Sequence, residues 1–333
     1  MLRALHGLLT ATALAAMTGP APAVEFKNLT IVVGFSPGGG YDAYARLLAR
    51  HIGRHIPGQP TVIVQNMPGS SSLKAVQYLD GSAPKDGSVI TAFNPGLITE
   101  SLLNAEKIRF KFSDVAWVGS ITRDLRACYA WGATGITSFD DLKLAKEFNI
   151  GAPAPGTSTF INAAVLKNMF GVRVHHVLGY AGSAEQRLAI ERGELDGDCG
   201  AWSSVPPEWL TAKRVHPLVS FAPVPIPGMI AEVPFAVDLA TSQADKDLLK
   251  VLIAPDAVGR PFVASKQVPP DRLAAVRAGF DATMQDPQFL AEAEKMDLPV
   301  SGPIGGPAAA KIIDDIYAAP AGLIARAQEV VGR

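Results

Sequence analysis

The sequence predicts an α/β protein of two domains, each built on a mostly parallel sheet. Short apolar runs rich in Val and Ile alternate with amphipathic runs of helical length, and this alternation occurs in two series along the chain. Strands that alternate with helices form βαβ units, in which the strands lie parallel. A chain of 333 residues with 48% apolar and 18% charged residues is long and apolar enough for two cores.

The first series occupies the N-terminal third of the chain. The expected elements are a strand at 29–33, a helix at 42–55, a strand at 61–65, a helix at 73–79, a strand at 89–93 and a helix at 97–104. The second series has strands at 127–131, 149–152, 174–178, 195–201 and 216–221, and helices at 160–169 and 184–192. Each series is sufficient for one sheet, which predicts two domains.

After residue 221 the chain changes character. Residues 222–234 are rich in proline and predict a surface loop. Beyond it we expect a strand at 260–264 and helices at 245–252, 270–284, 287–295 and 308–316. These have too few strands for a third sheet, so this part is expected to return to the first domain. The predicted division is residues 24–126 plus 222–333 in domain 1 and residues 127–221 in domain 2, with hinges near 125–129 and 219–221.

The N-terminus has the layout of a secretory signal peptide. Arg3 supplies a positive charge, residues 8–17 are apolar, and Ala21-Pro22-Ala23 matches an A-x-A cleavage site. The apolar run is too short to span a bilayer, which needs about 18 residues or more. We therefore expect cleavage after Ala23 and export to the periplasm, with a signal anchor or a buried N-terminal helix as the alternatives.

Charge and motifs exclude several classes of function. Cleavage would leave 29 basic against 31 acidic residues, and no Lys/Arg cluster is present, so neither nucleic acid nor an anionic membrane is an expected partner. The chain has no zinc-ligand spacing and no nucleotide-binding glycine motif, so no metal and no cofactor are expected. Cys128 and Cys199 are compatible either with a disulfide in an oxidising compartment or with two buried thiols.

A recurring Pro-Gly loop between strand and helix is the most informative feature. Glycine permits close approach to a ligand, Ser and Thr cap the helix, and free N–H groups at the helix start attract anions. Loops of this kind gather at the carboxyl ends of parallel strands. We therefore predict an anion site whose candidate residues are Ser36, Pro37, Gly38, Gly39, Gly40, Tyr41, Asp42, Ser70, Ser71, Asn94, Pro155, Gly156, Thr157, Ser158, Thr159, Ala181 and Trp202.

Some of these candidates also have structural interpretations. Asp42 is expected chiefly to cap the first helix, and Trp202 could equally pack in the core. Arg123 and Arg126 precede the strand at 127–131; arginine suits carboxylate binding, but solvated surface positions are favoured for both.

Residues 34–38 match the G-x-S-x-G motif of serine hydrolases. In such an elbow the residue after the serine donates its backbone N–H to the oxyanion hole. Here that residue is Pro37, which has no N–H. A Ser36 nucleophile is therefore disfavoured, and no catalytic residue is predicted.

Several ordered segments resemble the solute receptors of tripartite tricarboxylate transporters, also called the Bug or TctC family. The first is the run Ile31 to Asp42 followed by Ala45-Arg46-Leu47-Leu48. The others are Val64-Gln65-Asn66-Met67-Pro68-Gly69, Pro84-Lys85-Asp86-Gly87, Gly156-Thr157-Ser158, Arg192-Gly193-Glu194-Leu195-Asp196 and Val268-Pro269-Pro270-Asp271-Arg272-Leu273. Together they cover nearly the whole chain after residue 23.

This resemblance implies a type II periplasmic binding protein fold, with two α/β domains joined by two hinge strands around a central cleft. It further implies a monomeric, non-enzymatic receptor that captures a small organic carboxylate, di-/tricarboxylate or aromatic, and passes it to the permease subunits of a membrane transporter. The carboxylate would lie between residues 37–42 and 155–159. A ligand-sensing protein that signals to a membrane sensor is the alternative.

The sequence departs from the family pattern at three places. Tyr41 is bulkier than usual, Ser70-Ser71-Ser72 replaces Ala-Gly-Gly, and Ala201-Trp202 stands where Phe-Asp is common. The last change removes an acid that could contact a ligand amine. We therefore expect an apolar or aromatic carboxylate rather than an amino acid.

Overall fold

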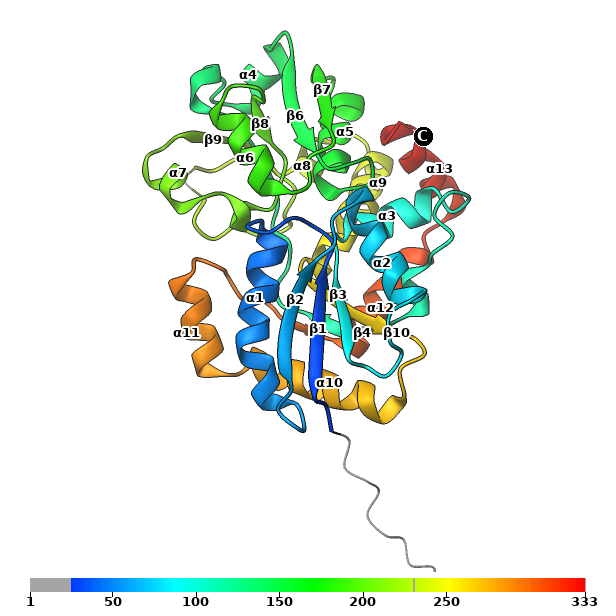
Figure 1. Cartoon of the computed structure of the whole chain (residues 1–333). Helices are drawn as coiled ribbons and strands as arrows, with labels where there is room; N and C mark the ends of the chain where they lie inside the picture. The colour runs from blue at the N-terminus through cyan, green and yellow to red at the C-terminus, as the bar shows by residue number, and fades with distance from the viewer. Residues whose placement is uncertain (1–24, 230, 333) are drawn as a thin grey trace, which may run out of the picture.

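The structure is a computed structural model that describes residues 25–229 and 231–332. Its strands form two sheets, one in each half of an elongated molecule (Figure 1). The predicted signal peptide lies outside the described residues. Within those residues, no helix is both long enough and apolar enough to cross a membrane.

The first sheet has six strands in the order β11-β4-β10-β3-β1-β2. Strand β1 pairs in parallel with β2 and β3, whereas β10 runs antiparallel to β3 and β4. The strands are β1 (Asn28–Val33), β2 (Thr61–Asn66), β3 (Val89–Ala92), β4 (Val115–Ser120), β10 (Pro261–Ser265) and β11 (Ile304–Gly305).

Successive side chains of β1 point to opposite faces of this sheet, and a different set of helices covers each face. Ile31 and Val33 pack with α1 (Gly40–Ile52), α10 (Pro270–Met284) and α11 (Pro287–Lys295). Val32 points to the opposite face. That face is covered by α2 (Leu73–Asp80), α3 (Gly96–Leu103) and α12 (Gly306–Tyr317).

The second sheet has five strands in the order β7-β6-β8-β5-β9. Strands β6, β7 and β8 are parallel, and β5 is antiparallel to its neighbours β8 and β9. The elements of this part are β5 (Ala127–Trp131), α4 (Phe139–Leu144), β6 (Phe148–Ala152), α5 (Ser158–Phe170), β7 (Val174–Leu178), α6 (Ser183–Glu191), β8 (Gly197–Asp198), α7 (Pro207–Thr211) and β9 (Val215–Ser220).

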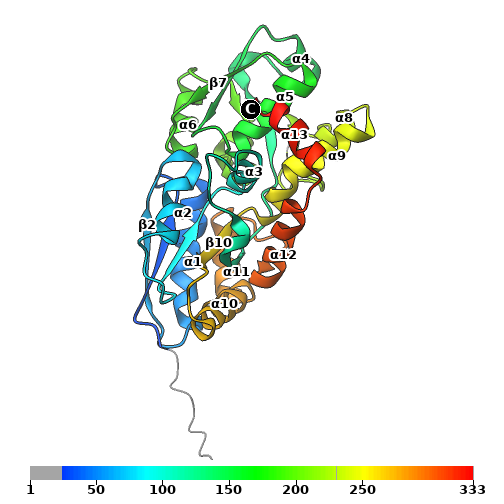
Figure 2. The same cartoon turned by 90° about the vertical axis from the view of Figure 1, so that its right-hand side faces the viewer.

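The chain crosses between the sheets twice, after β4 and after β9. The C-terminal part then divides between them: β10 and β11 belong to the first sheet, and helices α10, α11 and α12 pack against it. Helices α8 (Ala236–Leu239), α9 (Gln243–Ile253) and α13 (Ala321–Val330) share a hydrophobic core with β5, β6 and α5 (Figure 2). The domain bounds drawn from the sequence remain a prediction.

Most expected elements form within one to three residues of their predicted bounds. The strand expected at 195–201 is the clearest difference, because only Gly197–Asp198 pairs as β8. Beyond it the chain turns into the 3₁₀ segment Trp202–Ser204. Strand β4 and helices α4, α7, α8 and α13 were not among the predicted elements; apart from the ten-residue α13, these helices have only four to six residues each.

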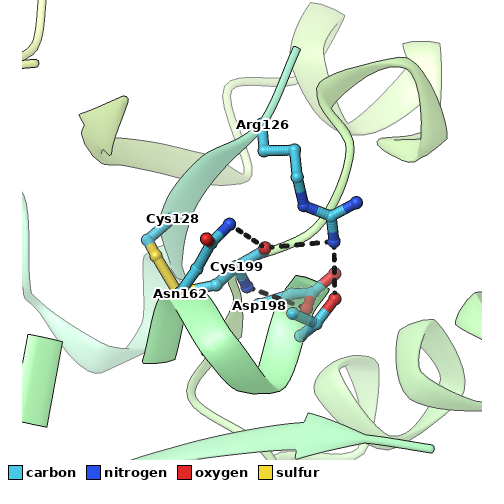
Figure 3. Close-up of a disulfide and its surroundings, with 6 residues drawn as sticks. Arg126, Cys128, Asn162, Asp198 and Cys199 are labelled. Carbon is cyan, nitrogen blue, oxygen red and sulfur yellow. Dashed lines mark hydrogen bonds between the residues drawn. A yellow bond between two sulfur atoms is a disulfide. The ribbon is translucent and has the colours of Figure 1, made fainter. Parts of the chain in front are cut away.

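Cys128 and Cys199 form a disulfide (Figure 3). The antiparallel register of β5 and β8 aligns Tyr129 with Asp198, and so brings the preceding and following cysteines face to face. Sequence left this bond undecided because the register is a tertiary property.

Candidate ligand-binding site between the two sheets

The first Pro-Gly loop, residues 36–40, meets the segment at the start of α6. The amide of Ser36 donates to the Ala181 carbonyl (3.2 Å), and its hydroxyl donates to Glu185 Oε2 (3.0 Å). Arg187 Nη2 donates to the Gly38 carbonyl (3.0 Å). Pro37 and Gly38 are otherwise exposed. These contacts connect the two halves of the molecule.

The other three loops meet one another. Ser71 Oγ donates to the Pro155 carbonyl (3.1 Å), whereas Ser70 is exposed. A Cβ on Gly96 would lie 2.3 Å from the amide nitrogen of Ser158, so the fourth loop requires glycine there. Gly156 adopts φ of +89°, which also favours glycine.

A cavity of about 50 Å³ lies between the loops. Six of the predicted site residues line it: Gly39, Gly40, Tyr41, Asn94, Thr157 and Thr159. The other lining residues are Phe35, Pro153, Ser183, Gln186, Gly200, Ala201, Ser204, Arg126, Asp198 and Arg260. The remaining predicted residues lie outside this lining, although Ser36, Ser71 and Ala181 hold the loops together through their hydrogen bonds.

The N-terminus of α1 opens toward this cavity. Within the described chain, the amides of Gly39, Gly40 and Tyr41 have no acceptor. Cβ atoms on Gly39 and Gly40 would lie 3.0 Å from Ser183 Oγ and 2.4 Å from Ser204 Oγ, so both glycines allow the opposite half to approach closely. Three free amides at a helix start form a site suited to a carboxylate.

Asp42 orders the first loop and does not line the cavity. Its carboxylate accepts hydrogen bonds from the Gly38 amide (2.9 Å), Arg46 Nε (2.9 Å) and Asn66 Nδ2 (2.8 Å). Burial acts to raise the pKa of Asp42, but these three donors outweigh it and hold the pKa below its ordinary value. The expected cap on the first amides of α1 is absent, because the carboxylate turns back to the loop.

The N-terminus of α5 is already occupied by side chains of the protein. Asn94 Oδ1 accepts from the amides of Ser158 (3.1 Å) and Gly96 (2.8 Å), and Thr157 Oγ1 accepts from the amide of Phe160 (3.3 Å). Asn94 Nδ2 in turn donates to Tyr41 Oη (3.0 Å). One asparagine therefore joins the third and fourth loops to the start of α1.

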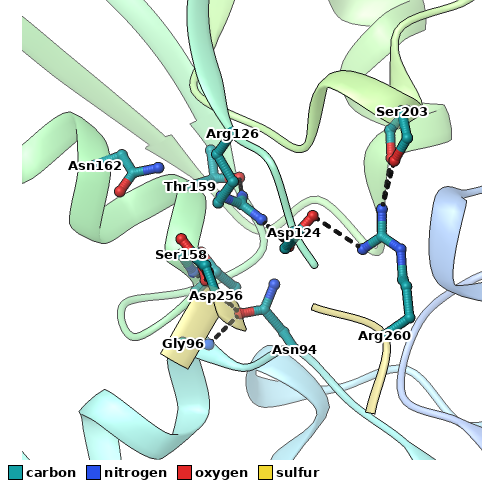
Figure 4. Close-up of polar contacts among 12 residues, drawn as sticks. Asn94, Gly96, Asp124, Arg126, Ser158, Thr159, Asn162, Ser203, Asp256 and Arg260 are labelled. Carbon is teal, nitrogen blue, oxygen red and sulfur yellow. Dashed lines mark hydrogen bonds and ion pairs between the residues drawn. The ribbon is translucent and has the colours of Figure 1, made fainter. Parts of the chain in front are cut away.

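Two buried arginines are the principal site residues that sequence reasoning missed. Arg126 and Arg260 are each 2% exposed, and both face Asp124 (Figure 4). Arg126 Nη1 lies 2.5 Å from Asp124 Oδ2, and Arg260 Nη1 lies 3.5 Å from Asp124 Oδ1. The preference for a solvated Arg126 is wrong, because this residue bridges to Ala201 where the chain enters the second sheet. Arg123 is exposed, as expected.

Both arginines are held by further contacts. Arg126 Nη2 donates to Thr159 Oγ1 (2.9 Å), and Arg260 Nη2 donates to Ser203 Oγ (3.2 Å). The Arg260 guanidinium also lies 4.5 Å from the ring centre of Tyr41, which stacks on Phe35. Burial acts to lower the pKa of both arginines, but neighbouring carboxylates outweigh it and raise the pKa, so both remain charged.

Two further buried carboxyl groups lie near Arg126. Burial raises the pKa of Asp198 to about 6 and that of Asp256 to about 7, against the opposing effect of Arg126 on both. Asp256 Oδ1 accepts from Ser158 Oγ (3.0 Å). The cavity is therefore surrounded by opposite charges rather than by backbone groups alone.

Trp202 packs in the core of the second half. Its ring lies edge-on to Tyr129, with centroids 6.3 Å apart, and it is 4% exposed. It lines a neighbouring, mostly apolar pocket of about 490 Å³, not the charged cavity. Across residues 25–229 and 231–332, no group of three or more His, Cys, Asp or Glu is placed to hold a metal ion.

Two α/β domains around a central site constitute the fold of a periplasmic binding protein, as the sequence predicts. BugD, described as a periplasmic binding protein, superposes with a TM-score of 0.71 at 16% identity, over 91% of this chain and 96% of BugD. MatC from Rhodopseudomonas palustris, solved with malate, superposes with a TM-score of 0.70 at 17% identity, over 92% and 99% of the two chains.

A second R. palustris protein, solved with adipate, has a TM-score of 0.71 at 20% identity, over 91% of this chain and 96% of its own. The resemblance drawn from the ordered motifs is thus confirmed at the level of the fold. No protein-family model matches the sequence, and the comparison with curated proteins finds no match.

Proposed function

We propose that this protein captures a small organic carboxylate in the cavity between its two sheets and releases it without chemical change. The observation that carries the proposal is the start of α1, where three amides that have no acceptor in the described chain border the cavity beside Arg260. Free helix amides and a guanidinium are the donors that carboxylates prefer. Malate and adipate in two proteins of the same fold support this ligand class.

The proposal places the protein in the periplasm as a monomeric receptor that delivers its ligand to the permease subunits of a tripartite tricarboxylate-type transporter. Closure would occur about the two chain crossings, near 125–129 and 219–221. Di-, tri- and aromatic carboxylates are the classes to rank first. A membrane sensor is the second candidate partner. A pull-down with the permease subunits and with the sensor distinguishes these two partners.

The first test is a thermal-shift screen followed by isothermal titration calorimetry, covering mono-, di-, tri- and aromatic carboxylates and amino acids. At least one carboxylate should raise the melting temperature and bind with a stoichiometry of one. A panel in which no carboxylate shifts the melting temperature would contradict the proposal.

A matched pair of glycine variants tests the location of the site. In Gly40→Ala the new Cβ would lie 2.4 Å from Ser204 Oγ and 3.2 Å from Arg260 Nη2, so closure is obstructed. We expect at least about fivefold weaker binding, equivalent to about 1 kcal/mol. Gly322→Ala is the control, because a Cβ there meets nothing within 4 Å. Equal affinities of the two variants would place the ligand elsewhere.

The hydrolase alternative has its own test. The Ser36 hydroxyl donates to Glu185, and the next residue, Pro37, has no amide for an oxyanion hole. Ser36→Ala should retain ligand binding, and the wild-type protein should not hydrolyse carboxylate esters. Ester turnover that is lost in Ser36→Ala would favour the enzyme.

A further inference from the structure

The charges around the cavity do not favour a simple anion. Five ionisable groups with at least about nine-tenths of their surface buried cluster there: Arg126 and Arg260 against Asp124, Asp198 and Asp256. Asp124 already contacts both arginines. When all five are ionised the cluster carries one excess negative charge, and an additional carboxylate would increase that excess in a site poorly accessible to water. Burying unbalanced charge is costly.

Asp198 is the member of this cluster that can receive a ligand. It is 8% exposed and lines the cavity together with Gly200. Its Oδ1 accepts the amide of Cys199 (2.8 Å; Figure 3). In the described chain, Asp198 Oδ2 has no hydrogen-bond or ion-pair partner. This oxygen is not among the fully buried polar atoms, so it is accessible from the cavity. A Cβ on Gly200 would lie 2.4 Å from Oδ2, so glycine provides the space that this oxygen occupies.

Asp256 differs from Asp198 in position. Its Oδ1 accepts from Ser158 Oγ, as Asp198 Oδ1 accepts from the Cys199 amide, but Asp256 does not line the cavity. The charged groups that act on Asp198 are Arg126, beside β5, and Arg187 of α6, and Tyr129 of β5 is the titratable group that faces it. Neither arginine forms a direct ion pair with Asp198 in the described chain. Asp198 is thus a carboxylate with one oxygen available.

Resting on the proposed function, we propose that the ligand is a small α-amino acid, with its ammonium group on Asp198 and its carboxylate at the start of α1 beside Arg260. A zwitterion adds no net charge to the cluster, and its ammonium group supplies the donor that Asp198 Oδ2 lacks. A cavity of about 50 Å³ favours a short side chain. The sequence argument against an amino acid relied on Ala201-Trp202, but the acid comes from Asp198 instead.

The test compares ligands that differ only in the α substituent: alanine, lactate and propionate, then aspartate, malate and succinate, by calorimetry at pH 7.5. Of alanine and aspartate, the amino acid that binds better should have an affinity at least about tenfold higher than the matching acid without an α substituent. This is the effect expected of a hydrogen bond between charged groups. In Asp198→Asn this preference should fall below about threefold. Asp256→Asn, the matched control, removes the same charge but no oxygen that lines the cavity, so it should retain a larger preference than Asp198→Asn.

A second measurement needs no variant. Calorimetry of the wild-type protein in buffers of different ionisation enthalpy counts the protons taken up on binding. The amino acid should bind with almost no proton uptake, whereas an unsubstituted carboxylate should bind with uptake by the acidic cluster.

Unsubstituted carboxylates that bind as tightly as amino acids would overturn this inference and leave the proposed function standing. A preference for amino acids that persists in Asp198→Asn would also overturn it. Binding by none of the six compounds, nor by any carboxylate of the wider panel, would overturn the proposed function together with this inference.

Discussion

Helices α1 and α5 both follow Pro-Gly loops of similar sequence, but their N-termini have different surroundings. At α1, Asp42 turns back to the loop, and the amides of Gly39, Gly40 and Tyr41 are left for a ligand. At α5, Asn94 and Thr157 accept the amides of Ser158 and Phe160. The same local motif therefore leaves helix amides without acceptors at α1 and forms a junction of side chains at α5.

The comparison of α1 with α5 shows that the N-terminus of a helix can bind an anion only when no side chain of the protein already accepts its amides. Asn94 lies 64 residues from Ser158 in sequence, so no local pattern around α5 reveals it. The charged residues are also distributed unequally: Arg260 stands over Tyr41 at the α1 side, whereas Arg126 bonds to Thr159 at the α5 side. On the proposed function, α1 would hold the ligand and α5 would support the site.

The largest expected effect concerns the α5 side. Arg126→Ala would remove the partner that contacts Asp124 Oδ2 and Thr159, and would leave a buried carboxylate less well compensated. We expect a loss of about 3–5 kcal/mol in the free energy of unfolding, measured by chemical denaturation. Arg123→Ala, at an exposed position, should change it by no more than about 0.5 kcal/mol. Similar losses in both variants would show that the ion pair is not the cause.

A smaller effect should appear with pH in the ligand-free protein. Burial raises the pKa of Asp198 to about 6 and of Asp256 to about 7, whereas an unfolded aspartate titrates near 3.9. Between these values the folded protein holds more protons than the unfolded chain, so this contribution to stability is lost as pH rises from about 4 to 7. The two aspartates should therefore lower the melting temperature between pH 5 and pH 8, whereas burial lowers the pKa of His176 to about 4, which opposes this fall below about pH 6.5.

Asp256→Asn checks this assignment, because an amide does not titrate. The fall in melting temperature between pH 5 and pH 8 should be smaller in the variant than in the wild type. An identical fall in both would assign the pH dependence to other groups.

The smallest expected effect tests the occupied helix start directly. Asn94→Ala would leave the amides of Ser158 and Gly96 without their acceptor, so α5 would come to resemble α1. We expect a loss of about 2 kcal/mol in the free energy of unfolding, from buried donors left without partners. Asn168→Ala, an exposed asparagine on α5 that donates one surface hydrogen bond to the Val330 carbonyl (2.6 Å), should cost no more than about 1 kcal/mol. Equal stability of the two variants would contradict the role assigned to Asn94.

Part of the site could be predicted because its chemistry is local. Gly39, Gly40 and Tyr41 follow an apolar strand after a short loop, and the first amides of a helix that starts there have no partner within the helix. Asn94, Thr157 and Thr159 were found in the same way, from Pro-Gly punctuation after strands. Each of these residues lines the cavity.

Arg126, Arg260 and Asp198 could not be found in that way. They come from a chain crossing, from the position before β10 and from β8, and no shared motif connects them. A charged residue that will be buried cannot be distinguished in sequence from one at the surface. Charged residues are rarely buried unless they are paired, and the tertiary structure decides that pairing. The one available signal was the position of Arg126 directly before an apolar strand, which indicates entry into a core.

The sequence by itself determined the two α/β series, the Pro-Gly loops at the strand ends and the likeness to solute receptors, because periodicity and turn chemistry act over a few residues. Only the tertiary structure decided the rest: the register that joins Cys128 to Cys199, the occupation of α5 by Asn94, and the burial of two arginines against three aspartates. These depend on which distant segments meet, and the free energy of a buried charge or a free amide is set by that neighbourhood.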